Sequence, residues 1–369
     1  MTAVDAKSRF CPARLKVARA FNGLPQRGVA ELVGTGQQFI ARLENGTKEP
    51  TEVMAAALGD TLGFEPSFFY GDQLDEFHDD ECAFRRRLTT QISVRATALA
   101  HGTLFGQLIQ YLSTLVRFPR PNIPSISINS NDDIEVAANK CRVHWGLKLD
   151  LPIGNMVRVS ESAGVPVAKF RGLADKVDSF SRHGSPNVIV LTEKPSSRCR
   201  FDVAHELGHL VLHRNIQTGT KETEAQANRF AAALLMPRRF LYEFPRNLHK
   251  IWDTLFELKK IWMVSLAAMI RKAHEHGVIT PSQYVRLYKE LSARGWLKSE
   301  PYEFEAEIPQ VIGLAFETAS SIHGLSLHDF RRELSWKPAT FEKITGTQFE
   351  VAAPVRQAKV LPLIRSRAS

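Results

Sequence analysis

The chain has 369 residues, of which 44% are hydrophobic and 24% are charged. These values are ordinary for a globular protein and argue against wholesale disorder. Lys and Arg number 48 against 39 Asp and Glu, and this net charge of +9 favours an acidic partner such as nucleic acid. No stretch approaches about 18 uncharged apolar residues, which excludes a membrane-spanning helix. The four Cys form no C-x-x-C pair, so we expect reduced thiols in a cytoplasmic protein.

Apolar residues recur at helical spacing in three short runs between residues 10 and 70, and they are Leu15, Ala18, Phe21, Val29, Leu32, Val33, Phe39, Ile40 and Leu43. This period predicts short helices that pack through their apolar faces. Gly34 permits the positive φ that a tight turn between two helices needs. The third helix leaves Gln37, Gln38 and Arg42 outward. Because Gln can bind an adenine edge through two hydrogen bonds, these three are candidate DNA-binding residues.

The residue composition in the middle of the chain predicts that a connector ends there and a second domain begins. Residues 74–118 begin with an acidic run and continue with an apolar helical period. Residues 119–133, rich in Pro, Ser and Asn, are the best boundary candidate. The expected parts are an N-terminal helical domain, a helical connector, a second domain and a C-terminal extension, at residues 1–73, 74–128, 129–300 and 301–369.

The second domain should be mainly helical with a small β-sheet. Two apolar runs read as strands, at residues 166–170 and 187–191. Helical patterns occupy residues 134–146, 199–214, 220–235 and 252–297. The predicted fold class is therefore mainly α, with an all-α N-terminal domain followed by an α+β domain.

A metal-binding pattern lies in the first of these central helices, where residues 201–213 read F-D-V-A-H-E-L-G-H-L-V-L-H. His205 and His209 are four residues apart, so a helix places both rings on one face, close enough for one zinc ion. Glu206 lies beside the first ligand and can act as a general base toward water. Gly208 is costly inside a helix and suggests a close approach by a neighbouring backbone. The alternative is a buried helix whose two histidines are merely hydrogen-bonded.

A catalytic zinc needs a third protein ligand from a nearby element. Glu224 on the next helix is the preferred candidate, and Glu222 is the competing one. Asn228, one turn beyond Glu224, could orient a ligating histidine. His213 is expected to support a metal-binding side chain from behind, to face substrate or to be exposed. Candidates for stabilising an oxyanion are His213, Tyr242 and Arg200.

The N-terminal run Q-Q-F-I-A-R-L-E-N-G-x-x-x-P at residues 37–50 resembles the XRE (lambda repressor-like) helix-turn-helix family, over about residues 12–70. The resemblance implies a five-helix domain that places its third helix in the major groove of DNA. The alternative is a helix-turn-helix that binds protein or only packs. DNA recognition by this fold commonly uses dimers, so a homodimer is also considered.

The central motifs resemble the ImmA/IrrE family of zinc metallopeptidases. They are R-F-D-V-A-H-E-L-G-H-L-V-L-H at 200–213 and E-x-x-A-N-x-F-A-A-x-L-L-M-P at 224–237, preceded by V-D-S-F-S at 177–181. The resemblance covers about residues 130–300 and implies a zincin-like, gluzincin-type domain. It also implies that His205, His209 and Glu224 bind zinc and that Glu206 is the catalytic base.

Together the two resemblances imply a zinc endopeptidase and transcriptional regulator that cleaves a DNA-binding repressor protein in a stress or mobile-element response. One alternative is a DNA-binding regulator whose peptidase-like domain is a sensor or scaffold without turnover. Another is self-cleavage near residues 119–133. Zincins typically bind substrate as a strand added to a sheet edge, and residues 177–180 or 188–191 are the candidates for that edge.

Overall fold

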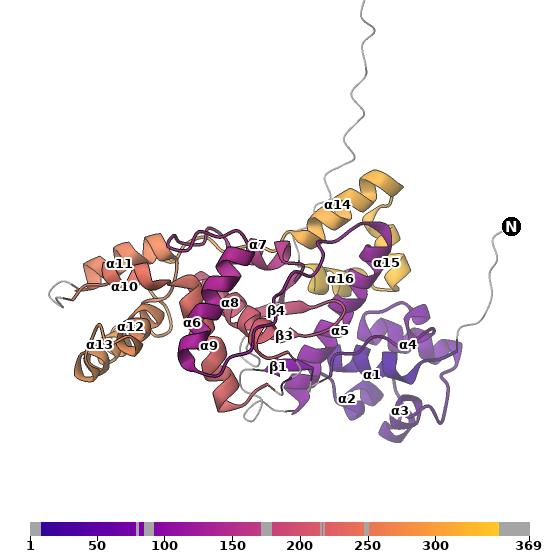
Figure 1. The fold of residues 1–369 in the computed structure, drawn as a ribbon. Coiled ribbons are helices and arrows are strands. Elements are labelled where there is room, and N and C mark those ends of the chain that lie inside the picture. The colour runs from indigo at the N-terminus through magenta and orange to yellow at the C-terminus, as the bar shows by residue number, and fades with distance from the viewer. Residues whose placement is uncertain are drawn as a thin grey trace, which may run out of the picture.

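The computed structural model describes residues 9–78, 81–84, 92–170, 179–214, 216, 218–246 and 251–346. Helices dominate, and one small sheet lies near the middle of the molecule (Figure 1). This confirms the predicted fold class, in which an all-α domain precedes an α+β domain. Within the described ranges no helix is long and apolar enough to cross a membrane.

The N-terminal domain is a bundle of short helices. They are α1 Pro12–Phe21, α2 Gln26–Leu32, α3 Gln37–Glu44, α4 Glu52–Leu62 and the 3-10 helix η1 Pro66–Phe69. Gly34 has a φ of 69° in the turn between α2 and α3, as the tight turn requires. The fifth helix implied by the resemblance is thus a single 3-10 turn, and its Phe68 and Phe69 are buried.

The connector contains a strand and a long helix, β1 Cys82–Phe84 and α5 Ile92–Leu115. α5 occupies the stretch whose apolar period predicts a helix. β1 is not predicted from the sequence, because three residues are too few to show a strand period.

The sheet has four strands in the order β1-β3-β4-β2. The remaining strands are β2 Val167–Phe170, β3 Phe180–Arg182 and β4 Val188–Thr192. β4 pairs in parallel with β2 and antiparallel with β3, and β1 pairs antiparallel with β3. The expectation that residues 188–191 form an edge is therefore wrong, because β4 has a neighbour on both sides. The other candidate edge is residues 177–180, and of these residues 177 and 178 lie outside the described part of the chain.

Two hydrophobic cores meet at this sheet. Phe170, Phe180 and Val190 belong to the first core, which also contains the N-terminal helices and α5. Ile189 and Leu191 belong to the second core. Because successive strand residues point to opposite faces, the apolar run of β4 fills both cores at once.

The second core is built from helices on the other face of the sheet. They are α6 Asn131–His144, α7 Met156–Ser162, α8 Ser196–Leu212, α9 Lys221–Leu235, α10 Arg238–Glu243, α11 Ile251–Trp262, α12 Leu266–Glu275 and α13 Pro281–Ala293. Gly208 explains the close contact of α8 with α9. A Cβ at this position would lie 3.0 Å from Cδ1 of Phe230 and 3.3 Å from the carbonyl oxygen of Ala227.

Residues 119–133, the predicted boundary, lie along the second core. The amide of Ile126 donates to the carbonyl of Val211 at 3.0 Å, and Ile123, Ile126 and Ile128 pack against the same core. The stretch is thus held against the domain that follows it.

The C-terminal helices return to the N-terminal domain. α14 Val311–His323, α15 Leu327–Leu334 and α16 Pro338–Thr345 contribute to the first core, and Figure 1 shows them beside α5. Thr340 Oγ1 donates to the carbonyl of Gly63 at 2.6 Å, and Trp336 forms a β-bridge with Phe64. Sequence patterns do not predict this return.

Candidate metal centre

Two neighbouring helices place three potential ligands. His205 and His209 lie one turn apart in the second half of α8. Glu224 lies in the first turn of α9, which opens with a capping box between Thr220 and Thr223. Such a box satisfies the free amides of the first turn and fixes where the helix begins. The capping box therefore fixes the place of Glu224 within the first turn of α9.

The three side chains converge. Nε2 of His205 and Nε2 of His209 are 3.1 Å apart. The carboxylate oxygens of Glu224 lie 3.4 Å from the first nitrogen and 3.3 Å from the second. In the described part of the chain this is the group of His, Cys, Asp and Glu atoms that could hold a metal, with all ligand atoms within 4.8 Å.

The donor set fits a small divalent cation. Tetrahedral zinc with bonds of about 2.0–2.1 Å would place its ligand atoms about 3.4 Å apart. Burial lowers the pKa of His209 to about 3, so its imidazole is neutral. Although burial opposes it, contacts with the two imidazoles lower the pKa of Glu224, so its carboxylate is anionic. Lone pairs of neutral imidazole and carboxylate that point at one centre are what a cation would require.

A hydrogen-bonded chain fixes the orientation of His209. Its Nδ1 lies 2.9 Å from Nδ1 of His213, and Nε2 of His213 lies 2.8 Å from Oε1 of Gln226. The amide nitrogen of Gln226 donates to Glu222 at 3.4 Å. Since the Gln226 oxygen can only accept, His213 must donate from Nε2 and accept at Nδ1. His209 then donates from Nδ1, which leaves the Nε2 lone pair directed at the centre.

The hydrogen-bonded chain places His213 against the potential ligand His209, and it favours Glu224 over Glu222 as the third potential ligand. Glu222 accepts a hydrogen bond from Gln226 and does not belong to the converging group. Gln226 is not predicted from the sequence. Its helical spacing of four from Glu222 was the available signal.

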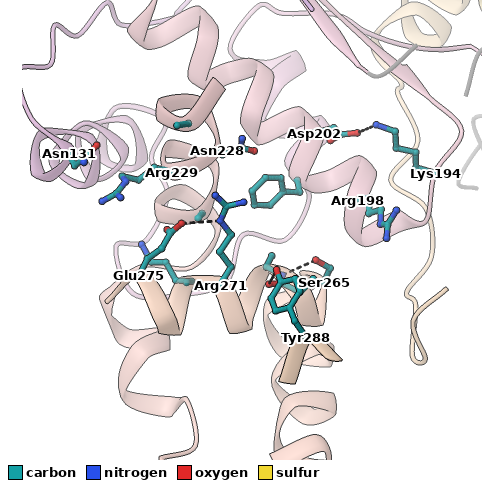
Figure 2. A pocket seen from close by; sticks show the side chains of 16 residues that line it. Asn131, Lys194, Arg198, Asp202, Asn228, Arg229, Ser265, Arg271, Glu275 and Tyr288 are labelled. Atoms are coloured by element: carbon teal, nitrogen blue, oxygen red, sulfur yellow. Dashed lines mark hydrogen bonds and ion pairs between the residues drawn. The ribbon is translucent and has the colours of Figure 1, made fainter. Parts of the chain in front are cut away.

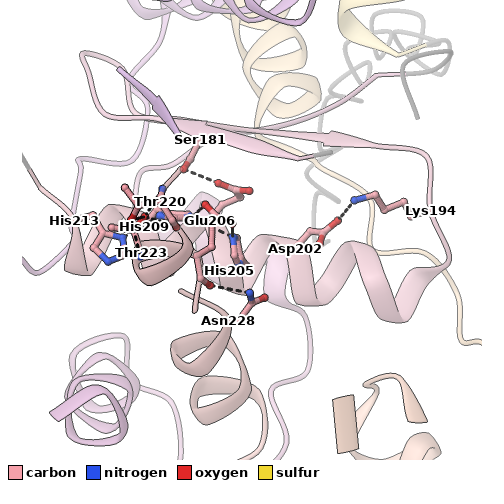
Figure 3. A network of polar contacts seen from close by, with 11 residues as sticks. Ser181, Lys194, Asp202, His205, Glu206, His209, His213, Thr220, Thr223 and Asn228 are labelled. Carbon is pink, nitrogen blue, oxygen red and sulfur yellow. Dashed lines mark hydrogen bonds and ion pairs between the residues drawn. The ribbon is translucent and has the colours of Figure 1, made fainter. Parts of the chain in front are cut away.

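Glu206 lies on the same turn of α8 but faces the sheet. It is fully buried, and the hydroxyl of Ser181 on β3 donates to Oε2 at 2.7 Å (Figure 3). Oε1 has no hydrogen-bond partner among the residues that the structure describes. Burial, partly offset by His205 and Ser181, raises the pKa of Glu206 to about 7. Ser181 is a further residue that sequence reasoning missed, although it lies in the V-D-S-F-S run.

Asn228 does not have the contact expected of it. Its side-chain nitrogen donates to the backbone carbonyl of Glu224 at 2.8 Å, because an Asn amide in a helix can bond back to the preceding turn. Asn228 also lines a cavity of about 460 Å³ between α8, α9, α12 and α13 (Figure 2). The cationic side chains in this lining are Lys194, Arg198, Arg229, Arg271 and Lys272.

Two of the suggested oxyanion stabilisers are placed elsewhere. Arg200 is buried and pairs with Glu307 and the carbonyl of Ile153, so its guanidinium is already engaged. Tyr242 is 79% exposed on α10. Neither position suits a donor to a group held at the metal centre.

The candidate DNA contacts lie far from this centre. Gln37, Gln38 and Arg42 are all exposed on α3, which lies at the outer edge of the molecule in Figure 1. The apolar side of α3 is buried through Ile40 and Leu43. The helix therefore presents a polar face to solvent.

Comparisons with known proteins divide the chain in the same way. Residues 13–67 match the model of a helix-turn-helix domain, and residues 160–274 match that of the IrrE N-terminal-like domain, an M78 peptidase family. The uncharacterized HTH-type transcriptional regulator YqaF of Bacillus subtilis (strain 168) is 32% identical over 62 residues, which are 17% of this chain and 82% of that protein. The chain therefore belongs to the helix-turn-helix regulators and joins its N-terminal DNA-binding domain to an ImmA/IrrE domain with a metallopeptidase-like fold.

Proposed function

We propose that the protein is a zinc-dependent endopeptidase and transcriptional regulator whose substrate is a DNA-binding repressor protein. The observation that carries this proposal is the convergence of His205, His209 and Glu224 within 4.8 Å, with Glu206 on the same turn. Zinc bound by these three side chains would supply Lewis acidity, which lowers the pKa of water to about 7 and polarises a carbonyl.

Glu206 is the proposed general base. Ser181 occupies its Oε2, so Oε1 is the atom that accepts the proton of the attacking water. A pKa raised to about 7 by burial suits a carboxyl that first takes this proton and then passes it to the leaving amine. Ser181 holds the carboxylate in one orientation throughout.

The N-terminal domain is proposed to bring the peptidase to DNA. Gln37, Gln38 and Arg42 would contact base edges or phosphates, and their exposure on α3 supports this role. A repressor bound nearby on the same DNA would then be the protein substrate that this chain meets most often.

Replacing one carboxylate oxygen tests the reaction. Glu206→Gln should retain zinc but leave coexpressed candidate repressors intact, whereas the wild type should yield truncated products. Glu257→Gln is the matched control, because Glu257 is exposed on α11 and its one ion pair in the described part of the chain is with Lys260. Wild-type cleavage by Glu206→Gln would show that the mechanism is wrong.

A regulator without turnover is the second candidate. The observation in its favour is the burial of the site, since Glu206 and both histidines are at most 1% exposed. In that case the protein would bind zinc stoichiometrically, yet no candidate repressor would be truncated on coexpression.

A further inference from the structure

β3 runs beside the candidate metal centre. Ser181 on β3 bonds to Glu206, and Nε2 of His183, just after β3, lies 3.3 Å from the carbonyl of His209. Figure 3 shows this strand above α8. An extended peptide that added to the outer edge of β3 would therefore lie next to the proposed catalytic residues.

The outer edge of β3 already carries a strand from the same chain. β1 pairs with it in antiparallel register, Cys82 opposite Arg182, Ala83 opposite Ser181 and Phe84 opposite Phe180. Position 83 thus lies opposite the residue that orients Glu206. β1 belongs to the connector after the helix-turn-helix domain and lies outside residues 160–274, which match the peptidase family.

Charged and aromatic contacts hold the segment before β1 in place. The guanidinium of Arg182 donates to Asp75 at 2.8 and 2.9 Å and to Glu81 at 3.1 Å. It also lies 4.3 Å from the ring centre of Phe77. Phe77 packs so closely on α5 that a Cβ at Gly102 would lie 2.6 Å from its ring. The described residues of this segment, 74–78 and 81–84, are therefore fitted to this position, and we call them the strap.

We propose that β1 occupies the peptide-binding edge of the peptidase domain and keeps it latent until the strap leaves β3. The inference rests on the proposed function, and it names the ligand of this edge as an extended peptide segment that replaces β1 in antiparallel register. Main-chain hydrogen bonds give such an added strand its affinity, and pockets for alternate side chains give it specificity. A tethered occupant competes at an effective concentration of about millimolar, so weak substrates are excluded while the strap is in place.

An engineered disulfide can lock or free the strap in one protein. Arg182→Cys puts a second thiol opposite Cys82, and paired residues of antiparallel strands have Cα atoms about 4.5–5.5 Å apart, which a disulfide can span. The zinc-loaded full chain also carries Glu206→Gln, so that binding is measured without cleavage. The probe is a fluorescein-labelled peptide of residues 79–88 with Ser in place of Cys82, followed by anisotropy. Arg182→Ser is the matched control, since it loses the guanidinium but cannot crosslink.

The reduced protein should bind the peptide at least about tenfold more tightly than the oxidised one, because the disulfide of the oxidised protein holds the strap on β3. Arg182→Ser should be insensitive to oxidation. Equal binding by oxidised and reduced Arg182→Cys would overturn the proposal. A different outcome separates the two proposals. If the reduced protein with Glu206 restored binds the peptide but cleaves no protein, the result counts against the proposed function and not against the proposal about the strap.

If the free-thiol count shows that the disulfide does not form, Asp75→Asn/Glu81→Gln carries the test. Both side chains are partly exposed, so the neutral isosteres should fold. Hydrogen exchange at residues 82–84 and 180–182 should then become faster, together with tighter peptide binding. Unchanged exchange, or faster exchange without tighter binding, would contradict the proposal.

Discussion

The candidate metal centre and the exposed face of α3 are both polar, but the structure constrains them very differently. At the candidate centre, buried side-chain nitrogens and oxygens converge on one point, and the proposed cation would balance their negative and lone-pair character. On α3, Gln37, Gln38 and Arg42 face solvent and satisfy their hydrogen bonds with water, whether or not DNA is bound. Buried polar groups therefore indicate their ligand in the free protein, whereas an exposed recognition face becomes informative only through its partner.

The largest effect is expected at the ligand that distinguishes the centre from an ordinary helix. Glu224→Gln should weaken zinc binding more than about 100-fold, because loss of a supporting residue alone costs about 10- to 100-fold. Titration calorimetry would measure this. Glu222→Gln is the comparison, and it should cost less than Glu224→Gln. A larger loss from Glu222→Gln would reverse the assignment of the third ligand.

The support behind His209 should matter nearly as much. Gln226→Leu removes the acceptor for His213 and with it the fixed tautomer of His209, so zinc affinity should fall about 10- to 100-fold. Gln226→Glu restores an acceptor and should recover much of the loss, which a purely structural defect would not do. Equal zinc affinity in Gln226→Leu and the wild type would exclude the hydrogen-bonded chain.

On the exposed face of α3, a substitution should weaken DNA binding by a factor comparable to the loss of zinc affinity above, but the size of the loss should depend on the DNA sequence. Gln38→Ala should cost about 1–3 kcal/mol of DNA affinity if the amide reads one base, and it should leave zinc content unchanged. The operator would first be selected from random DNA, and binding measured at fixed salt. If selection with the variant returns the wild-type operator with equal affinity, Gln38 does not read a base.

The smallest effect concerns the strap. Hydrogen bonding to Arg182, helped by the charge of His78 and by Gln110, lowers the pKa of Asp75, while partial burial opposes this. Because the pKa of Asp75 is lower in the folded protein, its ionised carboxylate stabilises the strap at pH values above the ordinary pKa of Asp. This stabilisation is lost as the pH falls through the pKa of the folded protein. Below about pH 4, protection of the β1 amides should therefore fall by about two- to fivefold, because the Asp75 carboxylate is partly exposed and solvent screens its ion pair. Hydrogen exchange would show this, and Asp75→Asn should lack the dependence.

Much of the candidate site could be predicted because its information is local. The spacing of His205, Glu206 and His209 needs only a helix, and the predicted helix at 199–214 corresponds to α8, Ser196–Leu212. Gly208 similarly indicated a close neighbour, and the structure shows the backbone of Ala227 beside it.

The parts that were missed depend on contacts between distant segments. β1 is a strand only because β3 offers it an edge, and Ser181 reaches Glu206 only once the sheet lies on α8. The bond from Asn228 to the carbonyl of Glu224 was not expected from the sequence, because an Asn amide in a helix can bond either to its own backbone or to a neighbouring side chain. The return of α14–α16 to the N-terminal domain likewise leaves no local pattern.

A crystal structure of the zinc-loaded chain, with anomalous diffraction recorded at the zinc absorption edge, tests the central claim most directly. The account predicts a single peak per chain at bonding distance from Nε2 of His205, Nε2 of His209 and the carboxylate of Glu224. A peak bound elsewhere, or histidine rings turned away from a centre that remains empty in excess zinc, would contradict it.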